Sequence, residues 1–91
     1  MDWDEMIGKR VRFVAVYTGC TRKGLLLHDV ATQAGDSFRD HMWLPNTKRF
    51  RKLRLRAGMQ ISFKAKVKRY RKRDGTWQFN VQNLSEIEVM G

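Results

Sequence analysis

Cations and aromatic rings are the residue types in this sequence whose spacing is best suited to chemistry. From Asn46 to Arg73 the chain carries thirteen Lys and Arg residues and no Asp or Glu. The later part of this block and the residues after it interleave cations with aromatic rings, in the order Lys64, Lys66, Lys68, Tyr70, Lys72, Arg73 and Trp77. Ammonium and guanidinium groups neutralise phosphates, and aromatic faces stack on unpaired bases. The block therefore predicts a polyanion-binding surface, since a merely solvating face would interleave carboxylates to relieve repulsion.

Catalytic and metal-binding patterns are absent from the sequence. The two His–carboxylate neighbours are His28-Asp29 and Asp40-His41. Adjacent residues on a strand point to opposite faces, so neither couple predicts a site. The two histidines can approach each other if their strands pair, but neither Cys nor Glu joins them at metal spacing, and the single Cys20 forms no internal disulfide. We therefore expect a protein that is not an enzyme and uses no catalytic residue, metal, cofactor or small-molecule substrate.

The overall composition fits an intracellular protein with a polyanionic partner. Nineteen Lys and Arg stand against nine Asp and Glu, which gives a net charge of +10. With 91 residues, of which 42% are hydrophobic, the chain is expected to form one domain, residues 1–91, around a modest core. Apolar runs are too short to span a membrane, and the start of the chain is acidic, unlike a secretory signal. The expected location is cytoplasmic, without a membrane partner.

A long β-hairpin over residues 59–82 is the element that must position the cations and rings. Apolar residues alternate with Lys64, Lys66 and Lys68 through its first half, which predicts a strand with one buried and one cationic face. Asp-Gly near the middle is a strong turn signal, and a second alternating strand begins at Trp77. The hairpin therefore presents its lysines on the face away from the core.

The register of this hairpin decides which side chains share a face. A two-residue turn at Asp74 and Gly75 would set Tyr70 opposite Phe79, with the aromatics beside the lysines. A three-residue loop over residues 73–75, with Gly75 left-handed, sets Arg71 opposite Trp77 instead. The second register is preferred because it keeps the apolar residues in phase. It also predicts that Arg69 faces Phe79, that Val67 faces Val81, and that the outward residues are Lys64, Lys66, Lys68 and Tyr70.

Three further strands are expected, at residues 9–18, 25–30 and 38–44, and residues 85–90 read as a closing strand or an extension of the hairpin. The strand over 9–18 is apolar on both faces, which predicts burial on two sides as in a small closed barrel. In the strand over 38–44, Arg39, His41 and Trp43 share one face. These three side chains form either a stacking surface or, if Trp43 turns inward, part of the core.

Helical structure is expected only in short pieces. Residues 1–8 predict one helical turn, in which Asp2 is the cap, Glu5 completes a capping box and Trp3 plugs the core. Residues 47–57 predict a short helical or irregular connection with Thr47 as its cap and Gly58 as its stop.

Together these elements resemble the oligonucleotide/oligosaccharide-binding (OB) fold. The resemblance rests on the two-sided first strand, a second strand ending in Leu27-His28-Asp29-Val30, and the hairpin around Asp74-Gly75, which stands where OB domains carry the loop between strands four and five. It spans roughly residues 9–89 and implies an all-β, five-stranded OB-like barrel with an N-terminal helical turn and a short connection between strands three and four. The first strand lacks the interior glycine that bends it in many barrels, so an SH3-like barrel stays open as an alternative.

The resemblance also implies a function and a site. OB domains commonly bind single-stranded nucleic acid across strands two and three and the flanking loops, which here implies the hairpin from Tyr70 through Trp77 and also Arg22, Lys23, Arg39, His41 and Trp43. We therefore predict a non-catalytic binder of single-stranded DNA or RNA, acting alone or within a protein complex that handles nucleic acid. Two alternatives are a module whose basic face docks on an acidic protein and a structural RNA binder of ribosomal type.

Overall fold

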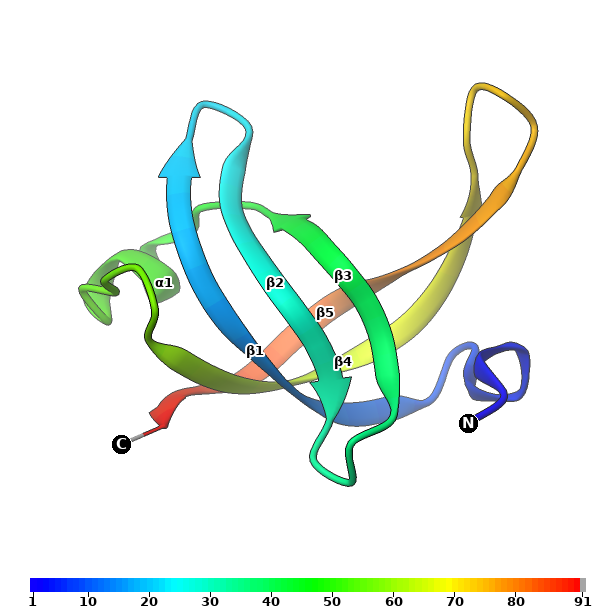
Figure 1. The fold of residues 1–91 in the computed structure, drawn as a ribbon, viewed down its shortest axis with the longest axis horizontal. Helices are drawn as coiled ribbons and strands as arrows, with labels where there is room; N and C mark the ends of the chain where they lie inside the picture. Colours follow the sequence, from blue (N-terminus) through cyan, green and yellow to red (C-terminus); the bar gives the residue numbers. More distant parts are fainter. Residues whose placement is uncertain (91) are drawn as a thin grey trace.

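The chain folds into one five-stranded antiparallel sheet that is strongly curled (Figure 1). This computed structural model describes residues 1–90. Its strands are β1 (Arg10–Thr21), β2 (Gly24–Thr32), β3 (Ser37–Leu44), β4 (Gln60–Arg71) and β5 (Trp77–Met90). A 3-10 turn, η1 (Trp3–Met6), precedes the sheet, and a short helix, α1 (Lys48–Lys52), joins β3 to β4. The all-β prediction is confirmed, as is the short connection between the third and fourth strands.

The order of strands across the sheet is β3-β2-β1-β4-β5, so β3 and β5 form its two edges. The curl brings these edges toward each other at one point, where the Phe38 and Phe79 ring centroids lie 6.5 Å apart. The backbone ladder stops at the edges, and closure into a barrel stays a prediction. Within residues 1–90, no helix combines the length and apolarity needed to cross a membrane.

The core lies on the concave face of the sheet and takes buried side chains from all five strands and from α1. Phe13 of β1 pairs with Phe63 of β4, and both side chains are fully buried. The opposite face of β1 is only half covered, because Val14 and Val16 are partly exposed there. The prediction that the first strand is buried on both sides is therefore wrong. The first two strands are also longer than the predicted ranges 9–18 and 25–30, because β1 runs to Thr21 and β2 begins at Gly24. A tight turn at Arg22 and Lys23 joins them.

The β4–β5 hairpin has the three-residue-loop register that the sequence favoured. Arg71 pairs with Trp77, Arg69 with Phe79, and Val67 with Val81. The loop closes through a hydrogen bond from the Lys72 amide to the Thr76 carbonyl, 2.8 Å long. Gly75 has φ +88°, in the left-handed region that only glycine adopts freely. The hairpin and its register are confirmed, and residues 85–90 extend its second strand rather than form a separate one.

Two bulges bend β5 after the hairpin. They fall where the pairing with β4 shifts, between Ser62 and Lys64 and between Lys64 and Lys66. Asn83 and Glu86, both left-handed, sit in these shifts with φ values of +54° and +49°. Each bulge adds one residue to β5 and changes which side chains face the core. As a result Leu84 and Ile87 both pack against the core, three residues apart.

The N-terminal turn caps one end of the core. Asp2 accepts a hydrogen bond from the Asp4 amide at 3.0 Å, and the turn is a 3-10 helix rather than an α-helical capping box. Trp3 packs on Phe13 and Phe38 with ring centroids at 5.9 and 4.7 Å, which confirms its predicted core role. Its indole nitrogen donates to the Ser37 carbonyl at 3.0 Å.

Helix α1 is shorter than residues 47–57 suggested. It ends at Lys52, well before the predicted stop at Gly58, because Leu53 already forms its C-cap. Thr47 stands at the N-cap but makes no side-chain capping bond to any residue in 1–90. One side chain, Phe50, anchors the helix in the core and is 4% exposed.

Candidate nucleic-acid interface

The outer face of β3 presents three of the residues expected to bind nucleic acid. Met42 and Leu44 are buried, so the alternating Arg39, His41 and Trp43 point away from the core. Trp43 is 38% exposed, which excludes the alternative that its ring fills the core. We call Arg22, Lys23, Arg39, His41 and Trp43 the β3 surface.

The β1–β2 turn is locked against the end of β3, and this places a cation beside Trp43. Gly24 follows the turn with φ +121°, and a Cβ atom there would lie 2.2 Å from the Leu44 carbonyl oxygen. This close approach admits only glycine. It holds Lys23 at the turn so that its Nζ lies 5.9 Å from the centroid of the Trp43 ring. A cation at that distance is attracted to the indole face.

His28 and Asp29 of β2 form a contact that strand alternation does not predict. Asp29 has φ +52° and sits in a bulge of β2, where the pairing with β1 shifts. The bulge turns its carboxylate back, so Oδ2 lies 2.9 Å from Nδ1 of His28. The expectation that these neighbours point to opposite faces is therefore wrong. His28 also pairs with His41 across the β2–β3 ladder, with ring centroids 6.4 Å apart.

The end of the β4–β5 hairpin carries a second exposed indole with two cations. Trp77 is 57% exposed. The guanidinium carbons of Arg69 and Arg71 lie 4.6 and 5.9 Å from its ring centroid. Asp4 of η1 accepts from Arg69 at 3.0 Å, which fixes the guanidinium near the ring. We call Arg69, Arg71 and Trp77 the Trp77 platform.

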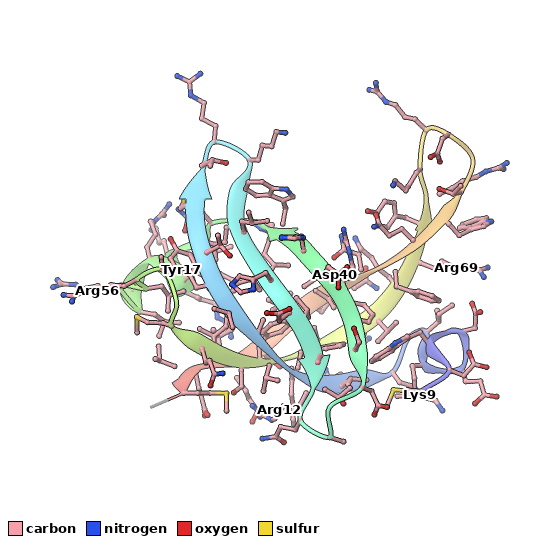
Figure 2. The ribbon with its side chains drawn as sticks, viewed as in Figure 1. Lys9, Arg12, Tyr17, Asp40, Arg56 and Arg69 are labelled. Atoms are coloured by element: carbon pink, nitrogen blue, oxygen red, sulfur yellow. The ribbon has the colours of Figure 1, made fainter. Side chains whose placement is uncertain are left out.

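The two faces of the hairpin point in different directions. Figure 2 shows Arg69 projecting on the side of the hairpin that is turned away from β2. Lys68 and Tyr70 alternate with it and therefore lie on the opposite face of the hairpin. The hydroxyl of Tyr70 donates to the side-chain oxygen of Gln78 on the paired strand. Trp77 and Tyr70 thus flank the hairpin on opposite sides.

The hairpin loop joins these two faces and carries Lys72 and Arg73, both exposed. Asp74 stabilises the loop, because its Oδ1 accepts from the Thr76 amide at 2.9 Å and from the Thr76 hydroxyl at 2.7 Å. These hydrogen bonds, with a smaller contribution from the charge of Lys72, lower the pKa of Asp74 below its ordinary value. The carboxylate therefore serves the turn, as its sequence context indicates.

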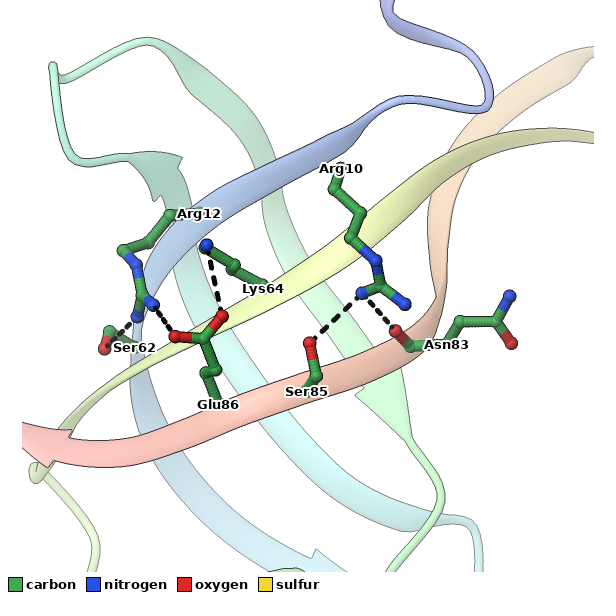
Figure 3. A network of polar contacts seen from close by, with 7 residues as sticks. All are labelled: Arg10, Arg12, Ser62, Lys64, Asn83, Ser85 and Glu86. Carbon is green, nitrogen blue, oxygen red and sulfur yellow. Dashed lines mark hydrogen bonds and ion pairs between the residues drawn. The ribbon is translucent and has the colours of Figure 1, made fainter.

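Lys64 lies apart from these surfaces, in a polar network on the outer face of β1, β4 and β5 (Figure 3). Its Nζ lies 3.1 Å from one oxygen of Glu86, whose other oxygen accepts from Arg12 at 3.0 Å. Arg10 donates to the Asn83 carbonyl and the Ser85 hydroxyl at 2.8 and 3.1 Å. The contact with Lys64, followed by the charge of Arg12, lowers the pKa of Glu86. We call this group the outer network; its members are Arg10, Arg12, Ser62, Lys64, Asn83, Ser85 and Glu86.

The expected site residues lie in three places, namely the β3 surface, the hairpin with the adjoining part of β4, and, for Lys64, the outer network. Figure 1 shows the β1–β2 turn and the β4–β5 hairpin extending to the same side of the molecule, which places the β3 surface and the hairpin residues on that side. Lys66 and Lys68 follow the outer face of β4 toward the hairpin, and Lys64 belongs to the outer network. Sequence reasoning missed Arg69, although the preferred register already set it two residues before Arg71 on the Trp77 face.

The cations around α1 belong to the basic block that predicts a polyanion-binding surface, but none of them is among the predicted site residues. They occupy the first half of the basic block and lie at the end of the molecule opposite the hairpin (Figure 1). Their signal in the sequence was the absence of carboxylates from Asn46 onward. Among residues 1–90, no group of three or more His, Cys, Asp or Glu side chains is placed to hold a metal ion.

Comparisons with protein-family models, with curated proteins and with solved structures found no match to this chain.

Proposed function

We propose that this protein binds single-stranded DNA or RNA without catalysis. The observation that carries the proposal is that two exposed indoles, Trp43 and Trp77, each have a cation at the ring. A base that stacks on such an indole brings its phosphate close to a positive charge, so stacking and charge neutralisation act together. Neither interaction requires a particular base, which fits a ligand of unrestricted sequence.

The three tryptophans support this proposal by their contrast. Trp3 stacks on the buried Phe13, whereas Trp43 and Trp77 are 38% and 57% exposed. Exposed rings of this size leave apolar surface in contact with water. Two such rings on one small protein are candidate contacts for a binding partner. A partner with flat aromatic faces would cover both rings. Unpaired bases have such faces, and paired bases within a duplex do not present them.

An OB-like barrel is the part of the proposal that concerns the fold. OB folds are partly open five-stranded barrels that bind oligonucleotides on strands two and three and on the loops after strands one and four. In its favour are the curled five-stranded sheet and the approach of Phe38 on one edge to Phe79 on the other. The β3 surface and the hairpin occupy the corresponding positions in this chain. Fold-level likeness leaves function open, so the exposed indoles carry the greater weight.

The path proposed for the strand runs from the β3 surface over the end of the hairpin. Trp43 offers a ring on the outer face of β3, and Tyr70 and Trp77 offer rings on the two opposite faces of the hairpin. Lys72 and Arg73 lie between them, at the loop. A flexible single strand can follow this bend, and the lysines of β4 extend the positive charge along its course. The residues assigned to nucleic-acid binding are Arg22, Lys23, Arg39, His41, Trp43, Lys66, Lys68, Arg69, Tyr70, Arg71, Lys72, Arg73 and Trp77. Lys64, which the sequence also suggested, is left out because its ammonium group is paired with Glu86 in the outer network.

The test is titration of Trp43→Ala and Trp77→Ala with labelled single-stranded DNA and RNA at fixed salt. Each lost stacking contact is expected to weaken binding by about 1–3 kcal/mol, or about 5- to 150-fold in Kd. Quenching of tryptophan fluorescence by the strand should fall in the same variants. Val89→Ala is the matched control, since that side chain is 37% exposed and lies near the other end of β5.

Two results would contradict the proposal. Wild-type affinity of both Trp variants for single strands would remove stacking from the mechanism. Equal binding of single strands and duplex by the wild type, without quenching, would leave charge as the sole source of affinity. In either case an acidic protein surface becomes the better candidate partner for the basic face.

A further inference from the structure

The cations around α1 form a surface that the proposed function does not use. Six of the nine residues from Lys48 to Arg56 are Lys or Arg, and the segment has no carboxylate. We call this group the α1 surface; its members are Lys48, Arg49, Arg51, Lys52, Arg54 and Arg56. Figure 2 shows Arg56 and Arg69 at opposite ends of the molecule, whose longest extent is 34 Å. The α1 surface is therefore separate from the Trp77 platform.

The cations of the α1 surface keep their charge, unlike those of the outer network. Arg49 donates to the Leu84 carbonyl at 2.9 Å, and Arg51 donates to the Asn46 carbonyl at 3.3 Å. A backbone carbonyl fixes a guanidinium without neutralising it. Across the described residues 1–90, the ion pairs involve other cations and leave the α1 surface without a carboxylate partner.

The shape of the α1 surface suits an anion. Lys48, Arg51, Lys52 and Arg54 line an open hollow of about 360 Å³, and all four are cationic. Arg54 adopts φ +49°, where glycine or asparagine would be less strained by about 1 kcal/mol. Arg54 directly follows the C-cap Leu53, a position at which a left-handed residue commonly ends a helix. Here the strained residue contributes one of the four charges around the hollow.

The chemistry of the α1 surface points to phosphates rather than bases. Phe50 is the aromatic residue of α1, and it is buried in the core. A surface of exposed cations without an exposed ring contacts the sugar–phosphate backbone but has nothing on which a base can stack. Such contacts do not distinguish single strands from duplex.

We propose that the α1 surface is a second nucleic-acid contact, one that binds the phosphate backbone irrespective of base and strandedness. This inference rests on the proposed function, because it makes the protein a two-site binder whose other site needs unpaired bases. The extent of 34 Å corresponds to about ten phosphate steps of one duplex strand at about 3.4 Å each. A nucleic acid of that length or longer can reach both sites, whereas a very short strand occupies only one.

The experiment compares two variants on two probes over a series of salt concentrations. Lys48→Gln/Lys52→Gln/Arg54→Asn removes three charges from the α1 surface, and asparagine suits the left-handed position. The stacking variant is Trp43→Ala/Trp77→Ala. The probes are a duplex of about 20 base pairs and a single strand of about 6 nucleotides, near the lower site size for one OB fold.

Each variant is expected to weaken binding to mainly one of the two probes. The α1 variant should lower the slope of log K against log salt for the duplex by about 2.7, at about 0.9 for each of three phosphate contacts. It should bind the short strand within about twofold of the wild type. The stacking variant should lose the short strand and keep its duplex slope. Arg10→Gln/Arg12→Gln/Lys64→Gln removes the same charge from the outer network and controls for net charge.

The α1 proposal is overturned if the α1 variant keeps the wild-type duplex slope, if the charge control lowers that slope equally, or if the wild type does not bind duplex. An acidic protein would then be the candidate ligand of the α1 surface. Failure of the proposed function gives a different result, in which the stacking variant binds the short strand normally while the duplex arm still reports on α1.

Discussion

The outer network and the Trp77 platform use the same strands, β4 and β5, and the same kind of cation, yet they treat it differently. In the outer network Lys64 and Arg12 share one carboxylate, that of Glu86. On the Trp77 platform Arg69 and Arg71 share one indole. Arg69 is also paired with Asp4, so among residues 1–90 it is Arg71 that has no carboxylate partner. A carboxylate neutralises the cations beside it, whereas an indole attracts them and leaves their charge in place.

The difference shows that a basic residue acquires its role from the group that faces it across the sheet. The bulge at Glu86 turns that carboxylate toward Lys64 and makes the lysine part of the packing between strands. Between the bulges and the hairpin loop the β4–β5 pairing is regular, so the hairpin register determines which residue lies opposite each cation. The register sets Trp77 opposite Arg71. One strand therefore carries a structural cation at its base and exposed binding cations at its end.

The largest expected effect comes from removing two charges from each region in turn. Arg69→Gln/Arg71→Gln should weaken single-strand binding by up to about 25-fold at 0.1 M salt, because each lost phosphate contact removes about 0.7 from the salt slope. The figure is an upper bound because Asp4 already neutralises part of the charge of Arg69. Arg12→Gln/Lys64→Gln changes the net charge equally but should mainly lower the melting temperature and alter binding much less. Titrations at several salt concentrations and thermal unfolding of both variants measure the two effects.

The reverse pattern would break the comparison. If Arg12→Gln/Lys64→Gln weakens binding as much as the hairpin variant does, the two regions form one electrostatic field and the indole adds nothing. Unchanged binding by Arg69→Gln/Arg71→Gln would remove the Trp77 platform from the site.

Much of the Trp77 region follows from the sequence, because local signals determine it. The Asp-Gly pair locates the turn but allows two registers. Keeping Val67 and Val81 on the apolar face favours the register that sets Arg71 opposite Trp77, which is the one in the structure. Trp3 is likewise predictable, since its helical spacing and position before the first strand mark it as a core plug. The direction of Trp43 stays open from the sequence, and it is the burial of Met42 and Leu44 in the structure that shows the ring pointing outward.

The outer network is not predictable in the same way, because it depends on bulges. The sequence over residues 86–89 alternates regularly between acidic and apolar residues. This pattern does not predict a left-handed backbone at Glu86. Asp29 poses the same problem in β2, where its bulge creates the contact with His28. Asparagine and aspartate tolerate this conformation more readily than other residues, but they occur too often to locate a bulge. The relative placement of the two hairpins likewise depends on the curl of the whole sheet.

A smaller effect is expected from Glu86→Gln, which removes the carboxylate and keeps the side-chain shape. Lys64 and Arg12 would then lose the charge that neutralises them, and the outer face of β4 would become more attractive to phosphates. Single-strand binding should strengthen, with a salt slope steeper by at most about 1.4, at about 0.7 for each freed cation. Titration of this variant against the wild type measures the change. An unchanged slope would mean that the strand does not pass near the outer network.

The smallest effect is the pH dependence of stability that the outer network confers. The contact with Lys64, then the charge of Arg12, lowers the pKa of Glu86 in the folded protein. A carboxylate with a lowered folded-state pKa stabilises the fold fully above its unfolded pKa, which is about 4.3 for glutamate. The contribution is lost as the pH falls through the lower folded-state value, because the protonated group no longer pairs with its cations.

The melting temperature of the wild type should therefore exceed that of Glu86→Gln at neutral pH, and the gap should close below about pH 4. The lowered pKa of Asp74 affects both proteins alike and cancels in the difference. A gap that persists at low pH would show that the side chain of Glu86 acts through packing rather than charge, and the contrast between the two regions would then lose its electrostatic basis.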